Sequence, residues 1–320
     1  MTKHFNLDSI TSDFVDSITV EGAKPLYELT VVEARRFLVD LQRQSHIDID
    51  ADVIDTFIPT KSSGDVDIRF VRPKGTQEKV LPLIIYLHGG GWILGDKETH
   101  DILIRKLAIC TNSVVAFVNY SRSPEAIYPS AIEEIYGVLE YLYSHYTDFN
   151  IDKDKIIIAG DSAGGNMAAV IAIKSKKENG PKIKFQLLLY PVTDTSMDTE
   201  SYKLFKDGPW LSKKAMEWFW NAYVPQKSER EDIYVSPLKA EIADLENLPP
   251  ALVVVAENDV LRDEGELYAA KLNDAGVDTT CVRINGTHHD FLMLNALQAS
   301  QSGEAAFMLI CSILNSKLKR

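Results

Sequence analysis

The chain has 320 residues, 45% of them hydrophobic and 25% charged, proportions typical of a globular protein with one large core. Its 34 basic and 46 acidic residues give a net charge of −12, which argues against a nucleic-acid partner because nucleic-acid binders present basic faces. No apolar run approaches the roughly 18 residues of a membrane span, and the first residues do not resemble a signal peptide, so we predict a cytoplasmic protein without a membrane span.

The cysteines support a reducing compartment. There are three, Cys110, Cys281 and Cys311, at long spacings and without a Cys-x-x-Cys pair. We therefore expect buried free thiols rather than a disulfide framework. The Asn-Gly-Thr sequon at 285–287 is interpreted as a turn, and the lysine-rich stretch 174–184 as a solvated loop.

The first part of the chain predicts a helix followed by an edge strand. Within residues 1–50, four apolar residues recur at steps of three and four positions, which predicts an amphipathic helix. They are Val31, Ala34, Leu38 and Leu41. Alternating apolar and charged residues over 65–71 then predict a half-exposed antiparallel strand near a sheet edge.

Short runs that are apolar at every position alternate with amphipathic stretches through the rest of the chain. Such runs are typical of parallel strands covered on both faces. They occupy 83–87, 114–118, 156–159, 185–190 and 251–256. The amphipathic stretches between them cover 131–146, 163–177 and 264–275. This alternation predicts the α/β class, with a mostly parallel, doubly wound sheet.

An aromatic-rich segment, about 191–237, interrupts the alternation directly after a predicted strand end. Ligands of open α/β sheets bind outside the carboxyl ends of the strands, so we predict that it caps an apolar pocket. Most of its aromatics are expected to pack, and a few to line the pocket; they are Tyr202, Phe205, Trp210, Trp218, Phe219, Trp220 and Tyr223. Trp92, Trp210 and Leu211 are the pocket candidates. We assign residues 1–50 to a cap segment and 51–320 to one domain that contains this insertion.

Ser162 is the candidate nucleophile. It lies in Gly160-Asp161-Ser162-Ala163-Gly164, between a predicted strand and a predicted helix. A G-x-S-x-G turn in this context forces the serine into a strained conformation and raises its hydroxyl above the sheet. A phosphate-binding loop is the alternative, but its characteristic G-K-[ST] ending is missing.

A serine hydroxyl needs a base at neutral pH, and only His288 and His289 follow it in the chain. Both stand after a strand pattern, and spacing alone does not separate them. No further ligand cluster accompanies the pair, so a metal site is not expected. Asp259 follows the 251–256 strand directly and is the candidate for orienting the base. Asp263 and Glu264 begin the next helix, where we interpret them as capping residues.

A glycine run completes the candidate chemistry. Gly89, Gly90 and Gly91 follow the 83–87 strand, and glycines leave backbone N–H groups free to point at a ligand. Such a loop is the usual partner of the G-x-S-x-G turn, and it predicts an oxyanion hole for acyl transfer.

These segments together resemble the hormone-sensitive-lipase-like esterases, the bacterial family IV carboxylesterases of the α/β-hydrolase superfamily. The matching pieces are HGGGW at 88–92, GDSAGG at 160–165, DVLRDEG at 259–265 and HDF at 289–291. The likeness runs from about residue 65 to the C-terminus. It implies an α/β-hydrolase fold with a helical cap built from the N-terminus and an insertion, and hydrolysis of short- to medium-chain acyl esters without metal or other cofactor.

The resemblance also implies residue roles. Ser162 matches the nucleophile, Asp259 the acid and His289 the base, whereas His88 matches a structural residue of the glycine loop. The oxyanion donors fall on the N–H groups of Gly90, Gly91 and Ala163, with Gly89 shaping the loop.

The chain departs from the family pattern at four places. Asn119 replaces a common aspartate and Ser121-Arg122-Ser123 departs from Arg-Leu-Ala, both near the glycine loop. Val260 replaces a proline, and Asp290 occupies a glycine position. An amide or formamide hydrolase with the same residues, and a small-molecule receptor on the same fold, remain alternatives. A homodimer is a possible assembly.

Overall fold

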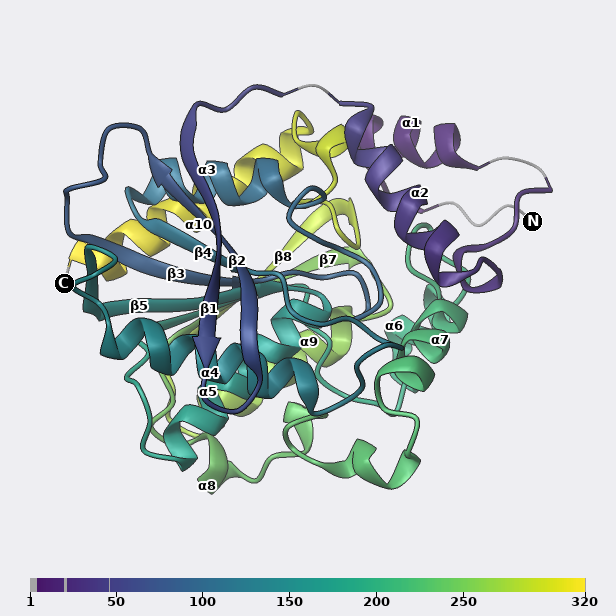
Figure 1. The fold of residues 1–320 in the computed structure, drawn as a ribbon. Coiled ribbons are helices and arrows are strands. Elements are labelled where there is room, and N and C mark those ends of the chain that lie inside the picture. The colour runs from purple at the N-terminus through teal and green to yellow at the C-terminus, as the bar shows by residue number, and fades with distance from the viewer. Residues whose placement is uncertain (1–4, 20–21, 46, 320) are drawn as a thin grey trace.

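The computed structural model describes residues 5–19, 22–45 and 47–319. One eight-stranded sheet crosses the molecule in the order β1-β2-β4-β3-β5-β6-β7-β8 (Figure 1). β2 pairs antiparallel with both β1 and β4, and every other neighbouring pair is parallel. The α/β-hydrolase class predicted from the sequence is therefore confirmed. The strands are β1 (Ala51–Thr60), β2 (Gly64–Pro73), β3 (Leu81–Leu87), β4 (Val114–Val118), β5 (Ile151–Asp161), β6 (Phe185–Leu189), β7 (Ala251–Asn258) and β8 (Thr279–His288).

Helices cover both faces of this sheet. α3 and α10 lie on one face, and α4, α5 and α9 lie on the other (Figure 1). The helices are α1 (Ser9–Ile18), α2 (Val31–Arg43), α3 (Asp101–Thr111), α4 (Ser130–Ser144), α5 (Ala163–Lys177), α6 (Glu200–Leu204), α7 (Lys213–Tyr223), α8 (Ile242–Leu245), α9 (Arg262–Asp274) and α10 (Gln301–Lys319). Short 3₁₀ turns occur at Leu26–Glu28, Lys227–Glu231, Pro237–Lys239 and Asn295–Leu297. No helix in these described ranges has the length and apolar character needed to cross a membrane.

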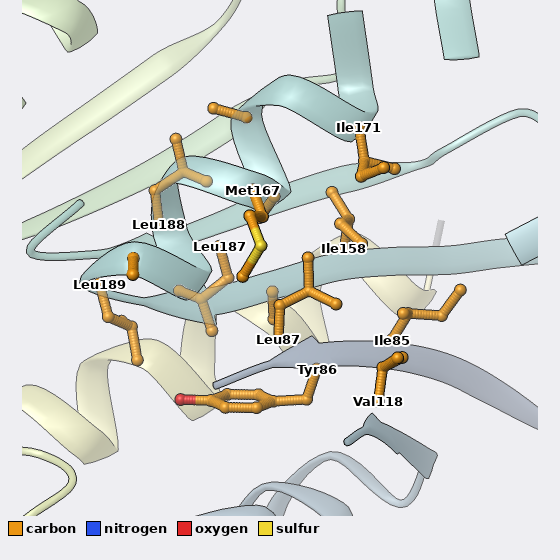
Figure 2. Close-up of a cluster of buried hydrophobic side chains, with 14 of the residues drawn as sticks. Ile85, Tyr86, Leu87, Val118, Ile158, Met167, Ile171, Leu187, Leu188 and Leu189 are labelled. Carbon is orange, nitrogen blue, oxygen red and sulfur yellow. The ribbon is translucent and has the colours of Figure 1, made fainter. Parts of the chain in front are cut away.

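The core forms where the central strands meet α5. Figure 2 shows Met167 and Ile171 of α5 among side chains of β3, β5 and β6. All of these side chains are buried, because the sheet is covered on both sides. This explains why the predicted strands are apolar at every position.

The N-terminal segment lies beside the insertion rather than on the main helical layers (Figure 1). α2 begins with a capping box between Thr30 and Glu33, and it buries the apolar face expected from the sequence. Arg35 of α2 donates to the carbonyl oxygens of Ile93 (2.8 Å) and Ser123 (3.0 Å). The segment is thereby attached to the loops that follow β3 and β4.

Two local predictions are wrong. The sequon at 285–287 lies within β8 rather than in a turn, because a bulge opposite Ala256 and Asn258 and a positive φ of 78° at Gly286 let the strand continue to His288. Lys174 lies in α5 rather than in a solvated loop. Its ammonium group binds Glu178 (2.6 Å) and Glu133 (3.1 Å), which offsets the burial of its stem.

The expectation of three buried free thiols is also wrong. Cys110 of α3 and Cys311 of α10 form a disulfide, and Cys281 is exposed on β8. The bonded residues are 201 positions apart in sequence, but α3 and α10 cover the same face of the sheet and bring their Cα atoms to 5.9 Å. The spacing of the two cysteines along the chain does not reveal that their helices are neighbours in the fold.

We predict that removing the disulfide destabilises the fold. A crosslink restricts the unfolded chain, so Cys110→Ser should lower the free energy of unfolding by roughly 2–5 kcal/mol. Thermal unfolding with and without a reductant measures the effect: the wild type should lose stability on reduction, and the variant should not respond. Cys281→Ser is the matched control. Equal melting temperatures for the oxidised and reduced wild type would contradict the prediction.

Candidate active site

Ser162 occupies the turn between β5 and α5. Its φ of 54° and ψ of −119° confirm the strained conformation expected for this turn. A side chain on Gly164 would overlap the carbonyl of Leu87 in β3, and one on Gly160 would overlap the carbonyl of Gly164. The glycines therefore permit the close approach that raises Ser162 at the end of the sheet.

Ser162, His289 and Asp259 form a continuous chain of hydrogen bonds. His289 Nε2 lies 2.8 Å from Ser162 Oγ, and His289 Nδ1 lies 2.7 Å from Asp259 Oδ2. The second oxygen of Asp259 accepts from the N–H of Leu261 at 3.0 Å, which fixes the carboxylate. All three candidates are buried at the carboxyl ends of β5, β7 and β8. The arrangement can transfer a proton from the serine hydroxyl to the imidazole.

The neighbouring histidine takes a different place. His288 is the last residue of β8, and its Nδ1 lies 2.6 Å from the carbonyl oxygen of His289. Its ring is packed near Phe14 and Trp210, and burial lowers its pKa to about 4. The geometry thus distinguishes the two histidines, which their positions in the sequence did not: His289 lies beside Ser162, and His288 does not.

The glycine loop lies beside Ser162 and carries backbone N–H groups that are free to donate. Gly90 and Gly91 have φ values of 100° and 60°, and the ring of Phe219 fills the space that a side chain on Gly91 would need. Within the described ranges, no hydrogen bond uses the N–H groups of Gly90, Gly91 or Ala163. The N–H of Gly89 differs, because it donates to Asp161 Oδ1 at 3.1 Å. Gly89 is therefore a loop-shaping residue and not a free donor.

A buried network behind the loop was not predicted. Asp161 accepts hydrogen bonds from Tyr86 Oη (2.8 Å) and Gly89 N (3.1 Å), and its other oxygen lies 3.3 Å from His100 Nε2. Burial alone would raise the pKa of Asp161, but His100 and Tyr86 outweigh burial and lower it. An aspartate directly before the serine was the available sequence signal. The network fixes the glycine loop to the end of β5.

His88 and Asn119 are structural neighbours of this loop. His88 stacks on Tyr120 with ring centroids 4.0 Å apart, and Tyr120 Oη donates to the His88 carbonyl. Burial lowers the pKa of His88 to about 3, so the ring is neutral. Asn119 donates to Asp67 of β2 at 2.9 Å and does not line the cavity. Its departure from the family pattern therefore concerns the contact between β2 and the end of β4.

Two further buried polar residues hold the insertion. Asn166, one turn after Ser162, donates to the carbonyls of Val192 (3.0 Å) and Val235 (2.9 Å). Glu264 accepts from the N–H of Thr193 at 2.6 Å. The capping interpretation of Glu264 is wrong, because its side chain turns away from its own helix into this contact. Burial raises the pKa of Glu264 well above its usual range, although the backbone donors oppose that shift.

A cavity of about 460 Å³ opens above Ser162 and His289. Its walls come from the N-terminal segment, the glycine loop and the insertion. Trp210 and Leu211 line it as predicted, and Phe219 joins them. Trp92 does not line it, because its ring is buried against Tyr223 with centroids 4.4 Å apart. The insertion's aromatics thus divide between packing and lining, as expected.

Asp290 lies beside the proposed base. Its φ is 67°, in the left-handed region that glycine favours, and its Oδ2 accepts from Trp210 Nε1 at 2.9 Å. The other oxygen lies 3.3 Å from His289 Nε2 without the alignment of a hydrogen bond. Burial raises the pKa of Asp290. Burial lowers the pKa of His289, but the carboxylates of Asp259 and Asp290 outweigh it and raise that pKa to about 9.

Comparison with known proteins decides the family. A model described as the α/β-hydrolase fold matches residues 84–293. The chain belongs to the α/β-hydrolase family. A crystal structure of a thermostable esterase from Pseudomonas putida superposes with a TM-score of 0.96 and 41% identity, over 99% of each chain.

Relatives from other organisms agree with this family. The carboxylic ester hydrolase LipN of Mycobacterium tuberculosis is 37% identical over 85% of this chain and 72% of its own. A protein of Acanthamoeba polyphaga mimivirus, named as an α/β hydrolase, is 42% identical over 98% of this chain and 88% of its own. The resemblance to hormone-sensitive-lipase-like esterases is thereby confirmed. The prediction that the chain is a carboxylesterase is confirmed with it.

We predict that Asp290 shifts the pH dependence of this esterase. The base must be neutral to accept a proton, and a nearby carboxylate favours its charged form. Asp290→Asn should therefore lower the pKa of His289 and move the acidic limb of kcat/KM toward lower pH. Asp207→Asn, which lines the same cavity, is the control and should leave the limb in place. A limb unchanged in Asp290→Asn would contradict this charge interaction.

We also predict that Asn166→Ala loosens the insertion. The substitution leaves two buried carbonyls without their donor, which should cost roughly 1–3 kcal/mol of unfolding free energy. Hydrogen exchange should show faster opening near Val192 and Val235. Asn285→Ala, at an exposed asparagine of β8 outside the insertion, should change neither quantity. Unchanged exchange at both carbonyl-bearing segments would show that Asn166 does not fasten the insertion.

Proposed function

We propose that this chain is a serine carboxylesterase that cleaves short- to medium-chain acyl esters through an acyl-enzyme intermediate. Ser162 is the nucleophile, His289 the base, and Asp259 the residue that orients the base. The observation that carries the proposal is the continuous hydrogen bonding from Ser162 Oγ through His289 to Asp259, at the base of a cavity of about 460 Å³.

In the first half-reaction, His289 Nε2 takes the proton of Ser162 as the hydroxyl oxygen attacks the ester carbonyl carbon. The carbonyl electron pair moves to the oxygen, which the N–H groups of Gly90, Gly91 and Ala163 stabilise. Ala163 begins α5, so the positive end of the helix dipole favours the same negative charge. The imidazolium then gives its proton to the departing alkoxide.

In the second half-reaction, His289 takes a proton from water, and the hydroxide attacks the acyl-enzyme carbonyl. Ser162 leaves with the proton returned by the imidazolium, and the acid is released. Asp259 keeps Nδ1 protonated and stabilises the imidazolium in both halves. Every step uses side chains and backbone N–H groups of this chain, the substrate and water.

The substrate range follows from the segments that enclose the cavity. Residues 1–50 and about 191–237 form a helical cap over the catalytic domain of 51–320. Leu38 of α2 and Phe219 of α7 lie in the walls on either side, so an acyl chain meets apolar surface. The limited volume favours acyl groups of short to medium length.

The decisive experiment is hydrolysis of p-nitrophenyl esters from acetyl to palmitoyl. Activity should peak at short or medium length, and Ser162→Ala should lower kcat by up to about 10⁶-fold, the scale of other nucleophile knockouts. Ser316→Ala, which removes an exposed serine hydroxyl of α10 outside the cavity lining, is the control. A fluorophosphonate should label the wild type and not Ser162→Ala.

Other results would point elsewhere. Near-full activity in Ser162→Ala would refute the assignment of the nucleophile. Labelling of Ser162 without turnover of any ester would favour the amide or formamide hydrolase, with amides as the next substrates. A folded protein that is neither labelled nor active would favour a receptor.

A further inference from the structure

Three exposed lysines surround the outer part of the cavity. Lys24 comes from the segment after α1, Lys206 from the loop after α6, and Lys214 from the first turn of α7. All three line the cavity that has Ser162 and His289 at its base, and all three are exposed to solvent. We call them the rim lysines. Three separate segments therefore bring ammonium groups to one opening.

The charge of this lining differs from that of the rest of the molecule. The lining holds three lysines against two acidic residues, Asp207 and Asp290. The remainder of the chain holds 31 of the 34 basic and 44 of the 46 acidic residues. Of the two acidic residues, Asp290 lies at the base of the cavity beside His289, so only Asp207 is exposed among the rim lysines. A locally positive opening thus occurs in a protein of net charge −12.

Among the described residues, the rim lysines have no close carboxylate partner, unlike lysines such as Lys203 and Lys177. Lys24 acts on a carboxylate only at longer range: hydrogen bonds from Thr30 lower the pKa of Glu33, and Lys24 lowers it further. Lys203 binds Glu200 at 2.6 Å, and Lys177 binds Asp244 at 2.7 Å. In the part of the chain that the structure describes, no carboxylate lies within 4.0 Å of a rim lysine's ammonium group. Lys214 has only a distant contact, 5.8 Å from the ring centre of Tyr27. The ammonium groups therefore remain available to an anion that enters the cavity.

The cavity wall between the two ends is apolar. Leu26, Leu38, Leu94 and Phe219 line it, and they suit a hydrocarbon chain rather than a charged group. A substrate that fits the whole cavity therefore has its ester at Ser162, a short apolar spacer along the wall, and a negative charge at the rim. Opposite charge at the opening also raises the rate at which such a substrate arrives.

We propose that the rim lysines make this enzyme selective for esters that carry an anionic group, such as a carboxylate, at the end remote from the scissile bond. The inference rests on the proposed function, because it takes Ser162 as the site of reaction. It adds a substrate class to that function: half-esters of dicarboxylic acids, or esters of alcohols that carry a carboxylate.

The test compares substrates that differ in charge and have the same leaving group or closely matched ones. For the acyl side, the pair is mono-4-nitrophenyl adipate and its neutral methyl ester; for the alcohol side, it is 3-(4-acetoxyphenyl)propanoate and its methyl ester, in which two methylene groups separate the charge from the phenolate. In at least one pair, kcat/KM should favour the anion by roughly threefold to tenfold, since exposed ion pairs are individually weak. The pair that shows the preference identifies the side that faces the rim.

Matched variants assign the preference to the rim lysines. Combined K24Q, K206Q and K214Q substitutions should bring the anionic and neutral rates together while leaving the neutral rate unchanged. Combined K203Q and K213Q are the control, because Lys213 is adjacent to Lys214 but donates to the Met197 carbonyl instead of lining the cavity. The control should keep the wild-type ratio.

Salt gives a second measurement on the unchanged protein. The Debye length falls from about 30 Å at 0.01 M to about 3 Å at 1 M salt, so the wild-type preference should shrink across that range. Equal rates within both substrate pairs at low salt, or a preference that persists in the triple variant, would overturn the inference without affecting the proposed function.

If the enzyme hydrolysed no ester, the proposed function would instead be refuted. The selectivity of the rim lysines would then be tested by calorimetric binding of monomethyl adipate and dimethyl adipate to the wild type. Tighter binding of the monoester, lost in the triple variant, would support the rim's selectivity for anions. Equal binding of the two compounds would overturn it.

Discussion

The structure depends on the close approach of two strand ends, β3 and β5. The β5–α5 turn can pass the end of β3 only because Gly160 and Gly164 have no side chains to meet the neighbouring carbonyls. That approach sets the strained conformation of Ser162 and places the first N–H of α5 beside the glycine loop. Asp161, in the same turn, holds the loop through Gly89. One packing constraint thus positions the nucleophile candidate and its candidate oxyanion donors together.

Electrostatics divide the cavity into two regions. At its base, charged groups are buried in a low-dielectric setting, where the carboxylates of Asp259 and Asp290 act strongly on His289. At its opening, the rim lysines are exposed, and each acts weakly through solvent. The strong interactions therefore act on the proposed base, and the weak ones act in the anion selectivity that we propose.

Local patterns predicted the strands, α5 and the Ser162 turn because each is determined by neighbouring residues. Asp259 could also be predicted from the sequence, since it directly follows a strand end. Other features depend on which segments meet in space. The choice of His289 over His288 came from family resemblance and not from spacing. The contact of Glu264 with the insertion, the pairing of Cys110 with Cys311 and the commitment of the Gly89 N–H to Asp161 join residues far apart in sequence, so no local pattern reports them.

The hydrogen bonds of Asn166 have a consequence for how such enzymes diversify. A single amide group holds the carbonyls of Val192 and Val235, so the segment between them leaves and re-enters the fold at one fixed point. Both ends of the segment are thus anchored at the same point. Exchange of this one contiguous stretch of gene can therefore alter which molecules are admitted, provided that the contacts of Trp210 with Asp290 and of Phe219 with Gly91 are kept.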